Sequence, residues 1–165
     1  GWFPKTPEGI QYAFTYDGME FQPIWHNIDD YLQFVGYLID LRVIQKIPDH
    51  PLFVNFNYFF KATKTFDQPY WVHMIFTNSK LEEIYLYEKH IPTHNLLKPS
   101  NWPPGHVIKD HHIRIIPDSL PQQRFRILAT ITQEQDLDWE NPDDYQWIEL
   151  GAFENKRNTI APISW

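Results

Sequence analysis

The chain contains the stretch Arg124-Phe125-Arg126-Ile127-Leu128-Ala129-Thr130-Ile131-Thr132, in which apolar side chains recur at every second position. A period of two places alternate side chains on opposite faces of a β-strand, whereas an α-helix repeats every 3.6 residues. The inward-facing side chains are predicted to be Phe125, Ile127, Ala129 and Ile131. This stretch therefore predicts a strand that lays one face on a hydrophobic core.

Similar patterns recur on both sides of this stretch. Further strands are predicted over residues 10–16, 54–61, 70–76, 84–87, 106–116 and 146–153. Together with a strand from about Leu32 they make about eight, at spacings typical of β-sandwiches. The high aromatic content of 17% and the 14 prolines also favour half-buried strands joined by turns. The predicted fold is all-β, an antiparallel two-sheet β-sandwich of the jelly-roll or immunoglobulin-like type.

Residues 28–42 allow two interpretations. The apolar residues Ile28, Tyr31, Leu32 and Val35 have helical spacing, and Asn27 or Asp29 could cap a short helix near residues 28–40. The same stretch also predicts a strand from about Leu32, with Gly36 where another segment approaches closely. The strand is favoured, and the helix is the alternative.

Length, charge and composition bound the class of protein. A chain of 165 residues fits one domain, 1–165, and its ends at Gly1 and Trp165 suggest a piece of a longer parent protein. The net charge of −7, without a basic cluster, argues against nucleic acid as a partner. No cysteine is present, which excludes disulfides and thiolate metal sites. No apolar run is long enough for a membrane helix, so membrane insertion by this segment is not expected, although the parent could span a membrane.

The middle of the chain carries an ordered series of short motifs. They are Phe34-Val35-Gly36-Tyr37, Tyr70-Trp71-Val72-His73-Met74-Ile75, Ser100-Asn101-Trp102-Pro103-Pro104-Gly105-His106-Val107-Ile108-Lys109-Asp110 and Ile113-Arg114-Ile115-Ile116-Pro117-Asp118-Ser119-Leu120-Pro121. In this order they resemble extracytoplasmic β-sandwich domains attached to bacterial membrane glycosyltransferases of the dolichyl-phosphate-mannose mannosyltransferase type. The resemblance covers residues 32–132 and departs at Gln123, where the family has a turn glycine.

This resemblance implies a sandwich similar to carbohydrate-binding modules, in a periplasmic or extracellular setting. It implies no catalytic role for the domain. The expected partners are carbohydrate or another envelope protein. The sequence also contains no glycine-rich phosphate loop and no G-x-S-x-G elbow, so a non-catalytic function is expected. The alternative is a protein-interaction or purely structural domain that uses exposed aromatic residues.

The loop over residues 136–147 is the most function-like segment. The candidate sugar-stacking residues are Trp139, Tyr145 and Trp147. The loop also holds five carboxylates, Asp136, Asp138, Glu140, Asp143 and Asp144. A solvated acidic loop is the favoured interpretation of these five, because their spacing fails the EF-hand pattern. The alternative is a calcium site, so Ca²⁺ is the one cofactor considered.

Trp102 is a fourth candidate for sugar stacking, because its indole lies in a proline-rich turn. The favoured interpretation is structural. Trp102 would close one end of the core while Pro103, Pro104 and Gly105 shape the turn.

Overall fold

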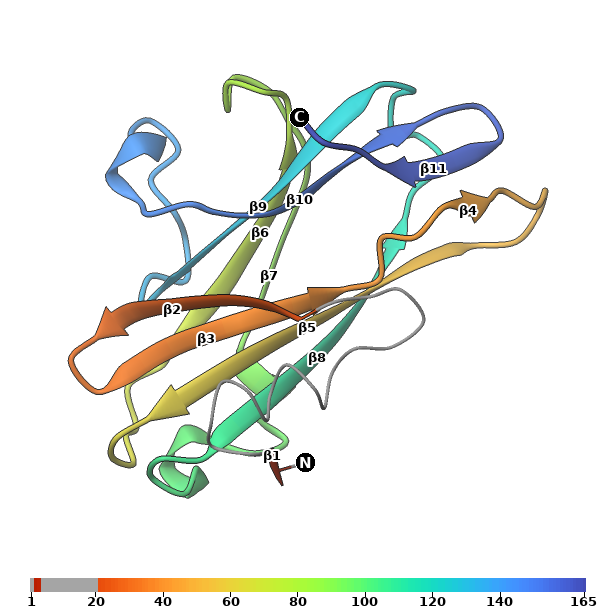
Figure 1. The fold of residues 1–165 in the computed structure, drawn as a ribbon. Helices are drawn as coiled ribbons and strands as arrows, with labels where there is room; N and C mark the ends of the chain where they lie inside the picture. The colour runs from red at the N-terminus through yellow and green to blue at the C-terminus, as the bar shows by residue number, and fades with distance from the viewer. Residues whose placement is uncertain (1, 4–20) are drawn as a thin grey trace. The chain divides into compact units, whose positions relative to one another are not determined.

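The computed structural model describes residues 2–3 and 21–165 of the chain. Within these residues the protein is all-β, with eleven strands and three short 3₁₀ segments. The strands form two antiparallel sheets, which confirms the all-β, two-sheet class expected from the sequence (Figure 1). The strand predicted over residues 10–16 lies outside the described residues.

The five-stranded sheet has the strand order β1-β8-β5-β3-β2. Its strands are β1 (Trp2–Phe3), β2 (Gln22–Asp29), β3 (Leu32–Ile39), β5 (Leu52–Ala62) and β8 (Val107–Ile116). Two 3₁₀ segments, η1 (Pro92–Asn95) and η2 (Pro99–Asn101), precede β8.

The six-stranded sheet has the order β4-β11-β10-β9-β6-β7. Its strands are β4 (Ile44–Gln45), β6 (Trp71–Thr77), β7 (Ile84–His90), β9 (Arg124–Thr132), β10 (Ile148–Asn155) and β11 (Thr159–Pro162). The third 3₁₀ segment, η3 (Pro142–Asp144), lies between β9 and β10.

Two compact units make up the chain, each assembled from separate segments. Among the described residues, the first holds residues 2–3, 21–40, 54–68 and 92–114, and the second holds residues 41–53, 69–91 and 115–165. The expectation of one domain over 1–165 stays a prediction. No helix in the described residues has the length and apolar character needed to cross a membrane.

The hairpin of β2 and β3 shows that the helix alternative for residues 28–40 is wrong. The β3 strand pairs with β2 on one side and with β5 on the other, so its backbone hydrogen bonds are made in the sheet. Phe34 and Val35 point to opposite faces and are both fully buried. Burial on two faces places apolar residues at neighbouring positions, and this produced the apparent helical spacing.

Gly36 of β3 occupies a position where no side chain fits. A Cβ atom there would lie 2.3 Å from the backbone oxygen of Gln22 and 2.6 Å from the ring of Phe21. The predicted close approach at this glycine is therefore confirmed. It allows Phe21 to pack with Val35, Phe59 and their neighbours in one buried cluster.

The core of the six-stranded sheet lies on one face of its central strands. Phe125, Ile127 and Ala129 of β9 are fully buried, as the alternation predicted. They share this face with Phe76 and Phe153, whose rings meet edge to face at 5.3 Å. Thr130 alternates with these residues, points to the opposite face of the sheet and is also buried, at 3% exposure. The reason is that the opposite face of β9 is partly covered as well.

Replacing Gly36 by alanine tests the close approach in the first unit. We expect Gly36→Ala to destabilise the protein by about 3 kcal/mol, the upper end for overpacking, because the neighbouring atoms include backbone. Gly105→Ala is the matched control, since its Cβ would meet nothing within 4 Å and only the φ of +79° is unfavourable. That change should cost only about 1–2 kcal/mol. Chemical denaturation measures the free energy of unfolding of both variants. Equal losses of this free energy would contradict the close approach at Gly36.

Candidate functional site

The second unit carries a polar and aromatic face at the β6–β7 edge of its sheet. Register places His73 opposite Lys89, and Ile75 opposite Tyr87. Residues directly opposite in an antiparallel pair share a face, so these side chains lie together. Val72, Met74 and Phe76 of β6 alternate with them and are buried in the core on the other face.

The loop between β9 and β10, residues 133–147, is tied to this face. The carbonyl of Glu134 lies 2.8 Å from His73 Nε2, and Asp136 forms an ion pair of 2.8 Å with Lys89. Leu137 of the loop is buried, with 7% exposure. The loop therefore covers part of the sheet rather than extending into solvent.

His73 links the sheet to the loop through both of its ring nitrogens. A carbonyl can only accept, so His73 Nε2 carries a proton and donates to Glu134 O. In the neutral ring, Nδ1 then accepts from the hydroxyl of Tyr87 at 2.7 Å. Burial lowers the pKa of His73, although the hydrogen bond to Glu134 opposes this shift. The neutral ring also stacks on Tyr87, with centroids 5.9 Å apart.

An aromatic cluster is built above His73. Tyr87 meets Trp139 edge to face at 5.1 Å, and Trp139 lies nearly parallel to Trp147, with centroids 6.3 Å apart and planes inclined by 23°. The ring of Tyr145 packs edge to face against that of Trp147, with ring centroids 6.4 Å apart. The structure thus brings together the three predicted stacking residues Trp139, Tyr145 and Trp147, and adds Tyr87 from β7.

Hydrogen bonds hold the rings of this cluster in place. The Tyr145 hydroxyl accepts from the Asp138 backbone N–H at 2.6 Å and donates to Glu134 Oε2 at 2.7 Å. Trp147 Nε1 donates to the carbonyl of Pro142 at 2.9 Å. Trp139 makes no such bond among the described residues and is 39% exposed, the most accessible ring of the cluster.

The five carboxylates of the loop are the candidate ligands for Ca²⁺, and two of them have partners within the second unit. Asp136 accepts a hydrogen bond from Lys89, and this bond lowers the pKa of the Asp136 carboxyl. Asp138 accepts from the Glu140 N–H and the Asn141 side chain, which closes its own turn. In the described part of the chain, no three of Asp136, Asp138, Glu140, Asp143 and Asp144 come close enough to share one ion. The loop uses Asp136 and Asp138 to fix its own shape, and the calcium interpretation stays a prediction.

Trp102 is not available to a sugar, which corrects its place among the stacking candidates. Its side chain is 1% exposed, stacks on Phe60 with centroids 6.0 Å apart and meets Phe66 edge to face at 5.6 Å. Its Nε1 donates to the carbonyl of Leu97 at 2.8 Å. Trp102 is therefore a core residue of the first unit, as the structural interpretation expected.

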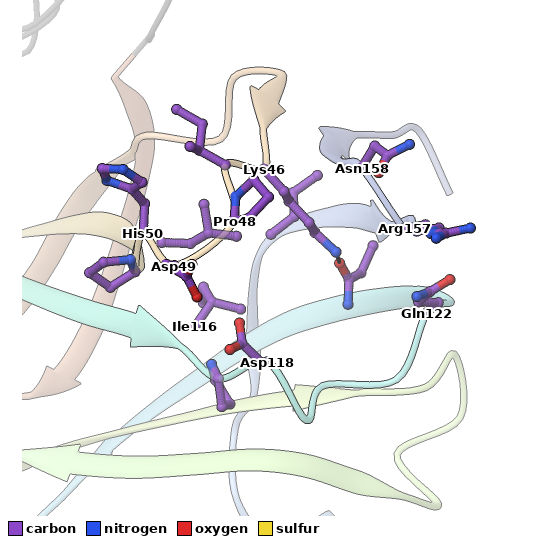
Figure 2. Close-up of a pocket in the computed structure, with 15 residues that line it drawn as sticks. Lys46, Pro48, Asp49, His50, Ile116, Asp118, Gln122, Arg157 and Asn158 are labelled. Atoms are coloured by element: carbon purple, nitrogen blue, oxygen red, sulfur yellow. Dashed lines mark hydrogen bonds between the residues drawn. The ribbon is translucent and has the colours of Figure 1, made fainter.

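A pocket of about 500 Å³ lies in another part of the second unit (Figure 2). Its lining comes from residues 46–52, residues 116–118, Gln122, Asn155, residues 157–158 and Ile160. Prolines at positions 48, 51, 117 and 121 are typical of turns, but nothing in a turn pattern shows that two turns meet. Its volume falls within the range usual for small-molecule sites.

No protein-family model, curated protein or solved structure matches the chain. Its function is therefore inferred from its own residues. Two places in the second unit combine accessible polar groups with a fixed framework: the aromatic cluster, defined as Tyr87, Trp139, Tyr145 and Trp147, and the pocket.

The buried His73 makes stability depend on pH. Its pKa is lower in the folded protein than the ordinary value of 6.5, so the unfolded chain binds the proton more readily. The free energy of unfolding should therefore fall as pH drops below about 6.5, and level off once pH lies below the folded pKa. Thermal melting between pH 8 and 5 should show this loss. It should be smaller in His73→Gln, whereas the exposed-site control His50→Gln should keep the wild-type slope. An unchanged slope in His73→Gln would contradict the assignment.

Proposed function

We propose that this chain is a non-catalytic carbohydrate-binding module, in which the aromatic cluster of the second unit holds a sugar ring. The observation that carries the proposal is the accessible indole of Trp139, which packs against the rings of Tyr87 and Trp147. A flat indole presents an apolar face to the C–H groups of a pyranose, and few polar groups are then needed to fix its orientation.

Fixed rings favour binding because less conformational freedom is lost. Tyr145 and Trp147 are held by hydrogen bonds, and Tyr87 is held by His73. A side chain with many free rotamers loses about 0.5–1.5 kcal/mol when a ligand immobilises it. In this cluster most of that loss has already occurred on folding, so more of the contact energy supports binding.

The charges around the cluster favour a neutral sugar. Glu140, Asp143 and Asp144 are exposed, and their carboxylates form no hydrogen bond or ion pair within the described residues. They can accept hydrogen bonds from sugar hydroxyls. Lys89, the one cation that pairs with the loop among the described residues, is already bound to Asp136. Uronic acids and sulfated sugars would meet like charge here, and neutral hexose chains would not.

The setting belongs to the same proposal. The resemblance of residues 32–132 supports a periplasmic or extracellular module that accompanies a membrane glycosyltransferase. In that role the module would hold a glycan or envelope partner near the enzyme.

A second candidate function is a protein-interaction domain. It is favoured by exposed apolar side chains over residues 43–53, which end in the first residues of β5, where Val43, Ile47 and Phe53 are 60%, 58% and 49% exposed. Exposed apolar side chains of this size mark an interface when they form a patch. Concentration-dependent sedimentation would favour this candidate.

Tryptophan fluorescence tests carbohydrate binding directly. Neutral oligosaccharides such as mannotetraose and cellotetraose should change the emission of the wild-type chain. Trp139→Ala should weaken binding by about thirtyfold, corresponding to about 2 kcal/mol for a central aromatic contact.

Trp165→Ala is the matched control, because this indole is 44% exposed and lies against Arg126 instead of the cluster. It should leave the affinity unchanged. The proposal fails if no neutral glycan alters the emission, or if the two variants lose affinity equally.

A further inference from the structure

The pocket of the second unit has a rigid frame built on Asn155. This side chain is 4% exposed and donates from Nδ2 to the carbonyls of Leu120 and Pro121, each at 3.0 Å. Its Oδ1 accepts a hydrogen bond from Lys46 Nζ. The buried amide of Asn155 therefore holds both the 117–121 turn and Lys46 in place.

Within residues 21–165, no carboxylate is in contact with the ammonium group of Lys46. Its ammonium group donates to two neutral oxygens, Asn155 Oδ1 and the carbonyl of Lys156. An ammonium group has three donors, so one N–H remains for a ligand. Burial lowers the pKa of Lys46, while the charge of Asp118 acts in the opposite direction. The lysine is thus partly desolvated but keeps capacity for an anionic group.

The pocket is lined by charges of both signs that do not pair with each other. Within residues 21–165, the side chains of Asp49 and Arg157 form no hydrogen bond or ion pair, and no contact ion pair joins Lys46 to Asp118. Figure 2 shows Asp49 and Asp118 to one side of the Lys46 ammonium group, and Arg157 to the other. A ligand that carries both charges would satisfy both sides at once.

We propose that this pocket binds a small zwitterion, with its anionic group at Lys46 and Arg157 and its ammonium group at Asp49 and Asp118. The ligand class is a free amino acid or a short peptide, which a pocket of about 500 Å³ accommodates. Arg157 offers a planar fork that matches a carboxylate, and the two aspartates offer acceptors to an ammonium group. This site is separate from the aromatic cluster and does not depend on carbohydrate binding.

Calorimetric titration with three matched probes tests the proposal. Glycylglycine carries both charges, N-acetylglycine only the carboxylate, and glycinamide only the ammonium group. Glycylglycine should bind at least about tenfold more tightly than either of the others, the factor expected for one charge-assisted hydrogen bond. No binding of glycylglycine at millimolar concentration, or equal binding of all three probes, would overturn the proposal.

Two substitutions assign the ends of the ligand. Arg157→Gln should remove most of the preference for glycylglycine over glycinamide, because glycinamide lacks the carboxylate. Asp118→Asn should remove most of the preference for glycylglycine over N-acetylglycine, because N-acetylglycine lacks the ammonium group. Both residues are exposed, so melting curves should stay near wild type. Lys80→Gln, an exposed charge outside the pocket, should change neither preference. Trp139→Ala should leave glycylglycine binding intact, which separates this test from that of the carbohydrate site. Wild-type preferences in both pocket variants would also overturn the proposal.

Discussion

The pairing of β6 with its neighbours β9 and β7 is the constraint on which the six-stranded sheet and its aromatic face depend. From Val72 to Thr77 every residue of β6 is buried, so both faces of this strand are packed against other parts of the protein. A shift of one residue would exchange the faces and move Met74 and Phe76 out of the core. The same shift would carry His73 away from Tyr87 and the loop. Core packing therefore fixes the register, and the register fixes the position of the aromatic cluster.

The fold was predictable where one face of a strand is apolar and the other is not. The strand predicted over residues 124–132 coincides with β9, because its period of two was uninterrupted. By contrast, β2 was missed. Its pairing with β3 has register shifts at two points, and Trp25 within it adopts a φ of 55°. Such irregularities break the alternation on which the prediction rests. The strands β4 and β11 are two and four residues long, too short to show a period.

The sequence also identified part of the candidate site. Trp139, Tyr145 and Trp147 lie within nine residues of one another, so a single loop contained the signal. Their supports could not be predicted, because His73 and Glu134 are 61 positions apart and Lys89 and Asp136 are 47 apart. Only the register of three strands joins them. The pocket could not be predicted for the same reason, since Asn155 and Leu120, which are hydrogen-bonded, are 35 positions apart in the sequence. Tertiary contacts, which the sequence does not show, determine which of these rings is accessible.

The irregular edges of the sheets bear on how copies of this protein behave at high concentration. An edge strand with free N–H and C=O groups is a template on which another chain can add a strand. Here β2 lies at an edge and is interrupted by Pro23 and by its register shifts, while β4 at another edge is only two residues long. The β7 edge carries the charged pair Glu88 and Lys89. None of these three edges offers a long, regular, apolar strand, so the same distortions that hid β2 from sequence analysis make these edges poor templates for edge-to-edge aggregation.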